Sequence, residues 1–310
     1  MQIKPDASKY FQKIPAALTI LSFLFFGFFK LGSTLMNTDA QHWYLRSTNF
    51  INAVEKLNFK KTYQDAKPGV PVMWLSGAGM KIMLNLYNSK YGFKPVLYTQ
   101  ETFRLFQISA IGPLVILSFI FLIFYFLLVK KLFNVNTAVF ALIFLALHPF
   151  YIANARFLHV DAVMTAFASL SFLSFLLFLK EARWRYNIAS GILFGLALLT
   201  KTQAGFIFPL IIILLTFKYL TEKQKTIIYF SKILFIWTLS SAVAYFAFFP
   251  SMWVHPINTV QKVFTEASYV VQTGRKDFGA LYIILMFCIG NLGGHLLFFH
   301  YRQLFSWYSI

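Results

Sequence analysis

The sequence predicts an all-α protein that crosses a membrane about eight times. Hydrophobic residues make up 58% of its 310 residues, and charged residues only 12%. Soluble domains average about 25% charged residues, so this composition indicates a polytopic membrane protein. The apolar residues are gathered into runs, several of which reach the length of roughly 20 residues that a spanning helix needs.

Eight segments are long enough, or nearly so, to span the bilayer: 14–31, 106–129, 137–152, 162–179, 186–199, 204–219, 227–249 and 278–299. The first resembles a secretory signal but lacks a small-x-small cleavage motif, so we expect a retained signal-anchor helix. The fifth and sixth segments are short. They are compatible either with two spans or with one re-entrant hairpin.

The distribution of basic residues predicts the orientation. Lys4, Lys9 and Lys13 precede the first segment, which favours a cytoplasmic N-terminus in a cell-membrane protein. Alternating sides from there leaves extracytoplasmic loops at 32–105, 153–161, 200–203 and 250–277. The net charge of +18 is spread along the loops, which favours contact with lipid phosphates and argues against nucleic-acid binding. The single cysteine, Cys288, excludes disulfide and cysteine-zinc frameworks.

The first external loop, 32–105, is long and rich in apolar residues. Residues 49–57 place Phe50, Val54 and Leu57 on one helical face. Residues 70–86 predict a second helix, and Pro68-Gly69 separates the two. We expect both helices to lie in the membrane interface. With no internal repeat and no separate soluble region, residues 1–310 are predicted to form a single transmembrane domain.

Two aspartates mark the predicted active site. Asp161 opens the apolar segment 162–179, and an ionisable group at membrane depth costs about 2.5–3.5 kcal/mol and is a functional candidate by default. Asp39 lies beside the first span on the same predicted side. The alternative for each residue is a helix cap that accepts backbone N–H bonds.

The residues around these acids favour phosphate-linked sugar chemistry. Transfer from a polyprenyl-phosphate sugar to a hydroxyl needs a carboxylate base, for which Asp39 and Asp161 are candidates. It also needs cations for the departing phosphate. The candidates for these contacts are Arg46, Arg156, His159 and Lys201. Arg156 could instead extend to lipid phosphates. A Mg²⁺ or Mn²⁺ ion held by the two aspartates is a further option.

Several of these stretches resemble one family in an ordered way. They are Asp39-Ala-Gln-His-Trp-Tyr-Leu-Arg-Ser47, Thr62-Tyr-Gln, Lys67-Pro-Gly-Val-Pro-Val-Met-Trp74, His148-Pro, Arg156-Phe-Leu-His-Val-Asp-Ala162 and Leu199-Thr-Lys201. Together they cover most of residues 35–270. The set is similar to prokaryotic relatives of the protein O-mannosyltransferases in the GT-C glycosyltransferase superfamily, which also includes the aminoarabinose transferase of lipid A.

The resemblance implies a helical membrane enzyme that uses a polyprenyl-phosphate sugar donor on the extracytoplasmic side. It implies Asp39 as the catalytic base, Asp161 as the second acid and Lys201 as a phosphate contact. Lys67 stands where relatives often have histidine, and a cation there could also face phosphate. Ala40 departs from the family, which commonly has a second acid after the first. Relatives usually continue with more spans, so we expect a C-terminally shortened form.

The acceptor implied is a hydroxyl on a protein, a lipid or a glycan. Two other functions stay open: a transporter or flippase of a lipid-linked or anionic solute, and a non-catalytic truncated homologue. A transporter would be expected to carry ionisable or helix-breaking residues near the middle of several spans, together with internal pseudo-symmetry. The spans here are mostly uninterrupted apolar runs, which favours the enzyme.

Overall fold

The fold is described from a computed structural model. It covers residues 14–33, 39–65, 68–95, 100–221 and 226–272. The regular structure within these ranges consists of helices, with no strand, which confirms the all-α prediction. Residues 1–263 form one compact unit, and the rest of this section concerns that unit. The second unit begins at Phe264, and its described part is the end of α13 (Pro256–Gln272).

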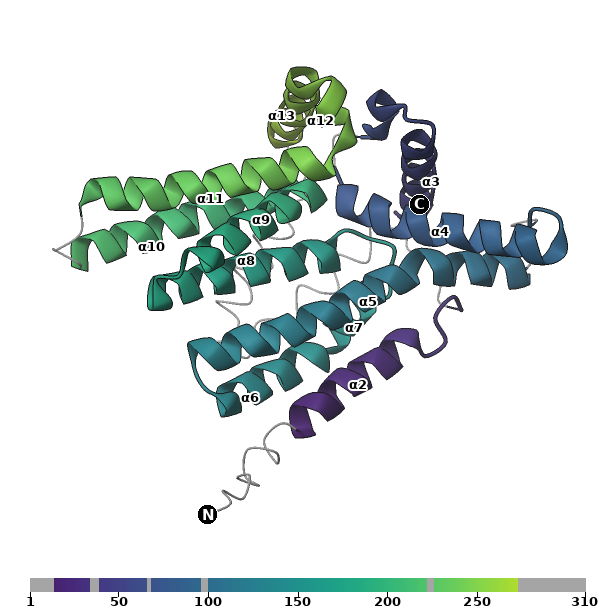
Figure 1. Ribbon diagram of the computed structural model, residues 1–310. Coiled ribbons are helices and arrows are strands. Elements are labelled where there is room, and N and C mark those ends of the chain that lie inside the picture. Colours follow the sequence, from purple (N-terminus) through teal and green to yellow (C-terminus); the bar gives the residue numbers. More distant parts are fainter. Residues whose placement is uncertain (1–13, 34–38, 66–67, 96–99, 222–225, 273–310) are drawn as a thin grey trace, which may run out of the picture. The chain divides into compact units, whose positions relative to one another are not determined.

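A row of packed helices forms the centre of the first unit. Its members, in spatial order, are α6 (Val135–Ala146), α5 (Gln100–Leu132), α8 (Asp161–Glu181), α9 (Trp184–Thr200) and α11 (Ile227–Phe248) (Figure 1). The helix α2 (Ile14–Phe28) packs against α5 and α6. The helix α10 (Ile207–Thr221) follows a short 3-10 turn, η2 (Thr202–Phe206).

Several helices of this unit are long enough to cross a membrane. In the described part of the chain, four helices meet this length and composition: Glu101–Leu132, Asp161–Glu181, Thr202–Thr221 and Ile227–Phe248. A fifth would be α6 joined to α7 (Pro149–Ala155), which are bent by 64°. The bend follows from Pro149, which lacks an N–H donor and keeps the preceding His148 out of the helical conformation.

The prediction of about eight spans is therefore only partly met. The helix α2 has 15 residues and α9 has 17, fewer than the roughly 20 that a straight span needs. The predicted segment 278–299 lies outside the described residues. The predicted span 137–152 is broken by the bend at Pro149.

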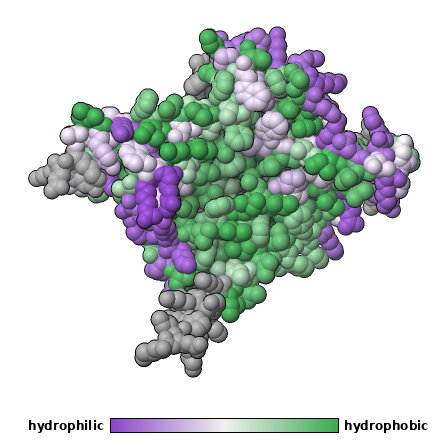
Figure 2. Space-filling view, in the orientation of Figure 1, coloured by the Kyte–Doolittle hydropathy of each residue, from purple (hydrophilic) through white to green (hydrophobic). Residues whose placement is uncertain are grey.

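The loops that join α5 to α6 and α8 to α9 lie on the predicted cytoplasmic side, and they meet at one end of the row, which we call the basic end. There Lys180 donates to the carbonyl of Leu132 at 2.5 Å, and Lys131 contacts the hydroxyl of Tyr186. The helix α9 starts beside this end and finishes at Lys201, at the opposite end of α8. The helix α9 therefore runs antiparallel to α8 along most of its length, although its 17 residues are too few for it to count among the four candidate spans. Figure 2 shows a broad hydrophobic surface over the middle of the helices and hydrophilic residues towards their ends.

The first loop contains the two predicted helices, with different limits. They are α3 (Ala40–Glu55) and α4 (Val70–Tyr91), and α4 packs against both α3 and α5. Phe50 is fully buried and Val54 packs on the core, as predicted. The prediction for Leu57 is wrong, because α3 ends at Glu55 and Leu57 is exposed with a φ of 53°.

Close helix packing fixes α9 against α11. A Cβ atom added at Gly191 would lie 2.4 Å from the carbonyl oxygen of Trp237, and one at Gly195 would lie 2.4 Å from that of Ser241. Small residues four apart allow two membrane helices to approach in this way. The Trp237 indole N–H donates to Ser190 Oγ at 2.9 Å beside this contact. The position of Lys201 at the end of α9 depends on this packing.

We predict that Gly191→Ala destabilises the protein by roughly 1–3 kcal/mol, the usual cost of overpacking. The control is Gly205→Ala in η2, because a Cβ there would meet only Leu198, at 3.9 Å. Thermal unfolding of the detergent-purified variants measures the difference. Equal midpoints for the two variants would contradict the packing described for Gly191.

Candidate active site

Asp161 and Lys201 form an ion pair between the beginning of α8 and the end of α9. The Lys201 Nζ atom lies 2.7 Å from Asp161 Oδ1. Asp161 is the first residue of α8, and no side-chain cap is formed at the preceding N-cap residue, Val160. The partners that the structure gives the Asp161 carboxylate are side chains, Lys201 and His159. The side chains are 40% and 29% exposed, so the pair remains open to water.

His159 connects this pair to Asp39. Its Nδ1 atom lies 3.2 Å from Asp161 Oδ2, and its Nε2 atom lies 3.4 Å from Asp39 Oδ2. Carboxylates only accept hydrogen bonds, so an imidazole that binds both must carry a proton on each nitrogen. A neutral ring can still donate from Nε2 to Asp39 while Nδ1 accepts from the Asp161 N–H, 3.4 Å away. We call Asp39, His159, Asp161 and Lys201 together the acid–histidine chain.

Asp39 is the open end of this chain. It occupies the N-cap position of α3 but makes no side-chain cap hydrogen bond there. Its side chain is 59% exposed, compared with 20% for His159. Two acids that are far apart in sequence are thus brought together through one imidazole, at the end of the row opposite the basic end. An exposed carboxylate beside a histidine can accept a proton from an incoming hydroxyl.

A glycine turn docks the first loop beside Lys201. The Gly69 N–H donates to the carbonyl of Thr200 at 3.2 Å. Gly69 has a φ of 54°, and a Cβ there would lie 2.1 Å from the Trp43 ring, so no larger residue fits. Further along α4, the Trp74 indole donates to the carbonyl of Phe248 at 2.9 Å. The start of α4 is therefore fixed on the ends of α9 and α11.

Arg46 is held by protein groups on two sides. Its guanidinium pairs with Asp65 and lies 5.0 Å from the centre of the Trp43 ring. Burial lowers the pKa of Arg46, and the charge of Asp39 acts in the opposite direction. Phosphate binding by Arg46 stays a prediction. In the structure its side chain joins α3 to the segment before Gly69. We call the contacts of Arg46 with Asp65 and Trp43 the loop brace.

Arg156 also has a protein partner. Its Nη2 atom donates to the carbonyl of Phe29 at 2.7 Å, just beyond the end of α2. The last carbonyls of a helix lack internal partners, so this contact stabilises the end of α2. Arg156 thus joins α2 to the turn before α8, and phosphate binding by it stays a prediction. Lys67 lies outside the described residues.

The arrangement of the two aspartates does not fit a carboxylate-held metal ion. The His159 ring lies between Asp39 and Asp161 and contacts both. In the ranges that the structure describes, no three His, Cys, Asp or Glu side chains are grouped so as to hold a cation. Mg²⁺ and Mn²⁺ prefer several oxygen ligands at once. Metal dependence therefore stays a prediction, and nothing in the geometry requires it.

Sequence reasoning did not assign Asp65 or Trp43 to the site. Asp65 lies 19 residues beyond Arg46, too far for any helical spacing to indicate a pair. The Trp43 ring occupies the space that a side chain at position 69 would need, and a Pro-Gly dipeptide indicates only that a turn is present. Both residues act on the site through the position of the loop.

The comparison with known families matched one family model. A family model described as dolichyl-phosphate-mannose-protein mannosyltransferase matches residues 103–246, somewhat less than half of the chain. The matched region contains His159, Asp161 and Lys201, whereas Asp39 and Arg46 lie before it. Neither the curated proteins nor the solved structures contain a significant match. The family match indicates a membrane glycosyltransferase and supports the GT-C type.

We predict that Asp65→Asn weakens the loop brace and lowers stability by about 1–3 kcal/mol, the range for losing a hydrogen bond to a charged group. Glu55→Gln is the matched control. It removes another loop carboxylate that pairs with a lysine, Lys81, but its side chain is 57% exposed, and such pairs contribute little. Thermal unfolding compares the two. The brace would be refuted if Asp65→Asn were no less stable than Glu55→Gln.

Proposed function

We propose that this protein transfers a sugar from a polyprenyl-phosphate donor to an acceptor hydroxyl at the extracytoplasmic face of the membrane. The observation that carries the proposal is the acid–histidine chain. In it an exposed carboxylate contacts an imidazole, and the imidazole contacts a carboxylate that is paired with a lysine. The acid–histidine chain lies at the end of the helices opposite the basic end. The bias of basic residues towards the cytoplasm supports the orientation.

Asp39 is the better candidate for the general base. Asp161 is engaged by Lys201 at 2.7 Å and by His159 at 3.2 Å, so its charge is already balanced. The contact that the structure gives Asp39 is with His159, at 3.4 Å, and its carboxylate is mostly exposed. A base needs hydrogen-bond access to the proton that it removes. Asp39 has that access, and Asp161 has the position of a supporting residue.

His159 orients the base. With its Nε2–H directed at Asp39, one carboxylate oxygen is held and the other can face the acceptor. Its Nδ1 atom is directed at Asp161, which fixes the ring from the other side. A base positioned by a third group is the general arrangement of activated-nucleophile sites. His159 is thus a positioning residue in the proposed reaction.

Lys201 faces the departing phosphate in this proposal. An ammonium group has three donors, and Asp161 takes one of them. In the reaction the acceptor oxygen bonds to the anomeric carbon, and its proton passes to Asp39. The bond from that carbon to the phosphate oxygen breaks, and the polyprenyl phosphate leaves with the electron pair. A cation beside the leaving oxygen stabilises the charge that develops there.

The family description provides the donor to test first. It names dolichyl-phosphate mannose, and dolichol is itself a polyprenyl alcohol. A synthetic polyprenyl-phosphate mannose is therefore the first donor for the purified chain, and release of polyprenyl phosphate is the readout. Release, with or without an added acceptor, supports the enzyme. Donor movement across vesicles without release would make the protein a transporter, and neither result would make it a non-catalytic homologue.

We predict that Asp39→Asn lowers the transfer rate by about 10²–10⁴-fold, the usual contribution of a positioned base. The amide keeps the size of the side chain but cannot accept the proton. Glu55→Gln is the control, because it removes a carboxylate from the same loop helix without touching the acid–histidine chain. Rates of polyprenyl phosphate release measure both variants. Full activity in Asp39→Asn would remove the base assignment.

We predict that Lys201→Ala raises the donor concentration needed for half-maximal rate by about 10- to 100-fold, as expected for one lost charged hydrogen bond. The acceptor dependence should change little. The double variant with Asp161→Asn removes the unpaired carboxylate that the single change leaves behind. A donor defect that disappears in the double variant would assign Lys201 a purely structural role.

A further inference from the structure

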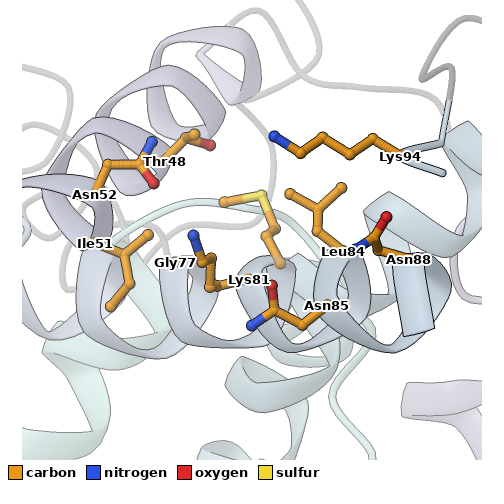
Figure 3. Close-up of a pocket in the computed structure, with 10 residues that line it drawn as sticks. Thr48, Ile51, Asn52, Gly77, Lys81, Leu84, Asn85, Asn88 and Lys94 are labelled. Carbon is orange, nitrogen blue, oxygen red and sulfur yellow. The ribbon is translucent and has the colours of Figure 1, made fainter. Parts of the chain in front are cut away.

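A second polar site lies between α3 and α4, away from the acid–histidine chain. The two helices approach closely at Gly77, where an added Cβ would lie 2.6 Å from the carbonyl oxygen of Ser47. Beside this crossing is a hollow of about 230 Å³ (Figure 3). Its polar lining residues are Thr48, Asn52, Lys81, Asn85, Asn88 and Lys94. Thr48 is roughly 13 Å along α3 from Asp39, at about 1.5 Å per residue.

The charges of this hollow favour an anion. No acidic side chain lines it, and its two formal charges are Lys81 and Lys94. Lys81 is balanced by Glu55, at 2.7 Å. Lys94 is exposed, and within the described residues it has no ion-pair partner. Figure 3 shows its side chain reaching from the segment after α4 across the hollow towards Thr48.

The amides favour a ligand that also carries hydroxyl groups. Asn52, Asn85 and Asn88 come from two helices and line the same hollow. Each side-chain amide can donate and accept hydrogen bonds, so the three together can bind hydroxyls in either sense. A bare inorganic anion would use only the donors.

Two exposed apolar side chains of α4 are sequence neighbours of residues that line the hollow. Ile82 and Leu86 follow Lys81 and Asn85 by one residue on α4, about 100° further around the helix. Their exposed fractions are 59% and 65%. An exposed apolar strip next to a cationic, amide-lined hollow matches a molecule with an anionic head and a hydrocarbon tail. In a membrane protein, a lipid is the ligand of that kind that is always at hand.

We propose that this hollow binds the anionic, hydroxyl-bearing headgroup of a membrane lipid. Lys94 binds the phosphate, the three asparagines bind the headgroup hydroxyls, and an acyl chain lies along Ile82 and Leu86. The site is separate from the proposed sugar-transfer site, so it stands whether or not the protein transfers sugars. A lipid held there stabilises the loop helices against one another.

The test is lipid-dependent stability of the chain, residues 1–310, in a neutral detergent. Phosphatidylglycerol should raise the unfolding midpoint by a few degrees, because a ligand that binds only the folded state stabilises it. Phosphatidylcholine and inorganic phosphate at the same concentration should have much smaller effects. Native mass spectrometry should show the bound phosphatidylglycerol directly.

The variants assign the effect to the hollow. Lys94→Gln should lose most of the increase caused by phosphatidylglycerol. Lys90→Gln makes the same change of charge, but Lys90 lies over the ring of Tyr91 at 5.0 Å and outside the hollow, so it should keep the increase. Asn88→Ala leaves every charge in place and should also reduce it, which provides a second variant if Lys94→Gln is unstable.

Three results would overturn the proposal. The first is an equal response of Lys94→Gln and the wild type to phosphatidylglycerol. The second is an equal response of the wild type to phosphatidylcholine, which would remove the preference for an anionic headgroup. The third is an equal response to inorganic phosphate, which would make the hollow an anion site without a role for the lipid.

Discussion

The charge of Asp161 sets the main constraint on this structure. A carboxylate at the start of an apolar helix is costly unless it is paired or hydrated. Here the partner comes from the end of the next helix, where Lys201 approaches to 2.7 Å. The pair can form only if α9 returns to the start of α8 and is held there. The close contact of α9 with α11 at Gly191 and Gly195 provides that support.

The same constraint extends to the first loop. The carbonyl of Thr200, next to Lys201, accepts the Gly69 N–H, so the loop is docked on the helix end that carries the ion pair. The loop brace then fixes α3 relative to Gly69, through Arg46, Asp65 and Trp43. Asp39 opens α3, so its distance from His159 is set by these contacts rather than by any spanning helix.

The helices could be predicted from the sequence because apolar runs and their period are local properties. The break at Pro149 could also have been predicted from the sequence, since a proline in an apolar run bends or ends a helix. The grouping of Asp39 with Asp161 followed from the bias of basic residues, which predicts the side of each loop. The sequence could not predict that His159 lies between the two acids, nor that Arg46 and Arg156 have protein partners. Those contacts depend on how loops fold against helix ends, and no spacing along the chain encodes them.

The family match divides the site into two parts. It covers residues 103–246 and therefore the helices that carry His159, Asp161 and Lys201, but not α3 and α4. In the proposed reaction the matched part faces the departing phosphate, which every donor of this class shares. The unmatched part carries Asp39, the residue that we propose meets the acceptor. Helix ends that bind a common phosphate have little freedom to change, whereas a loop docked through a few contacts can vary with the acceptor. The choice of acceptor would then depend on α3 and α4, and the chemistry of the donor on α8 and α9.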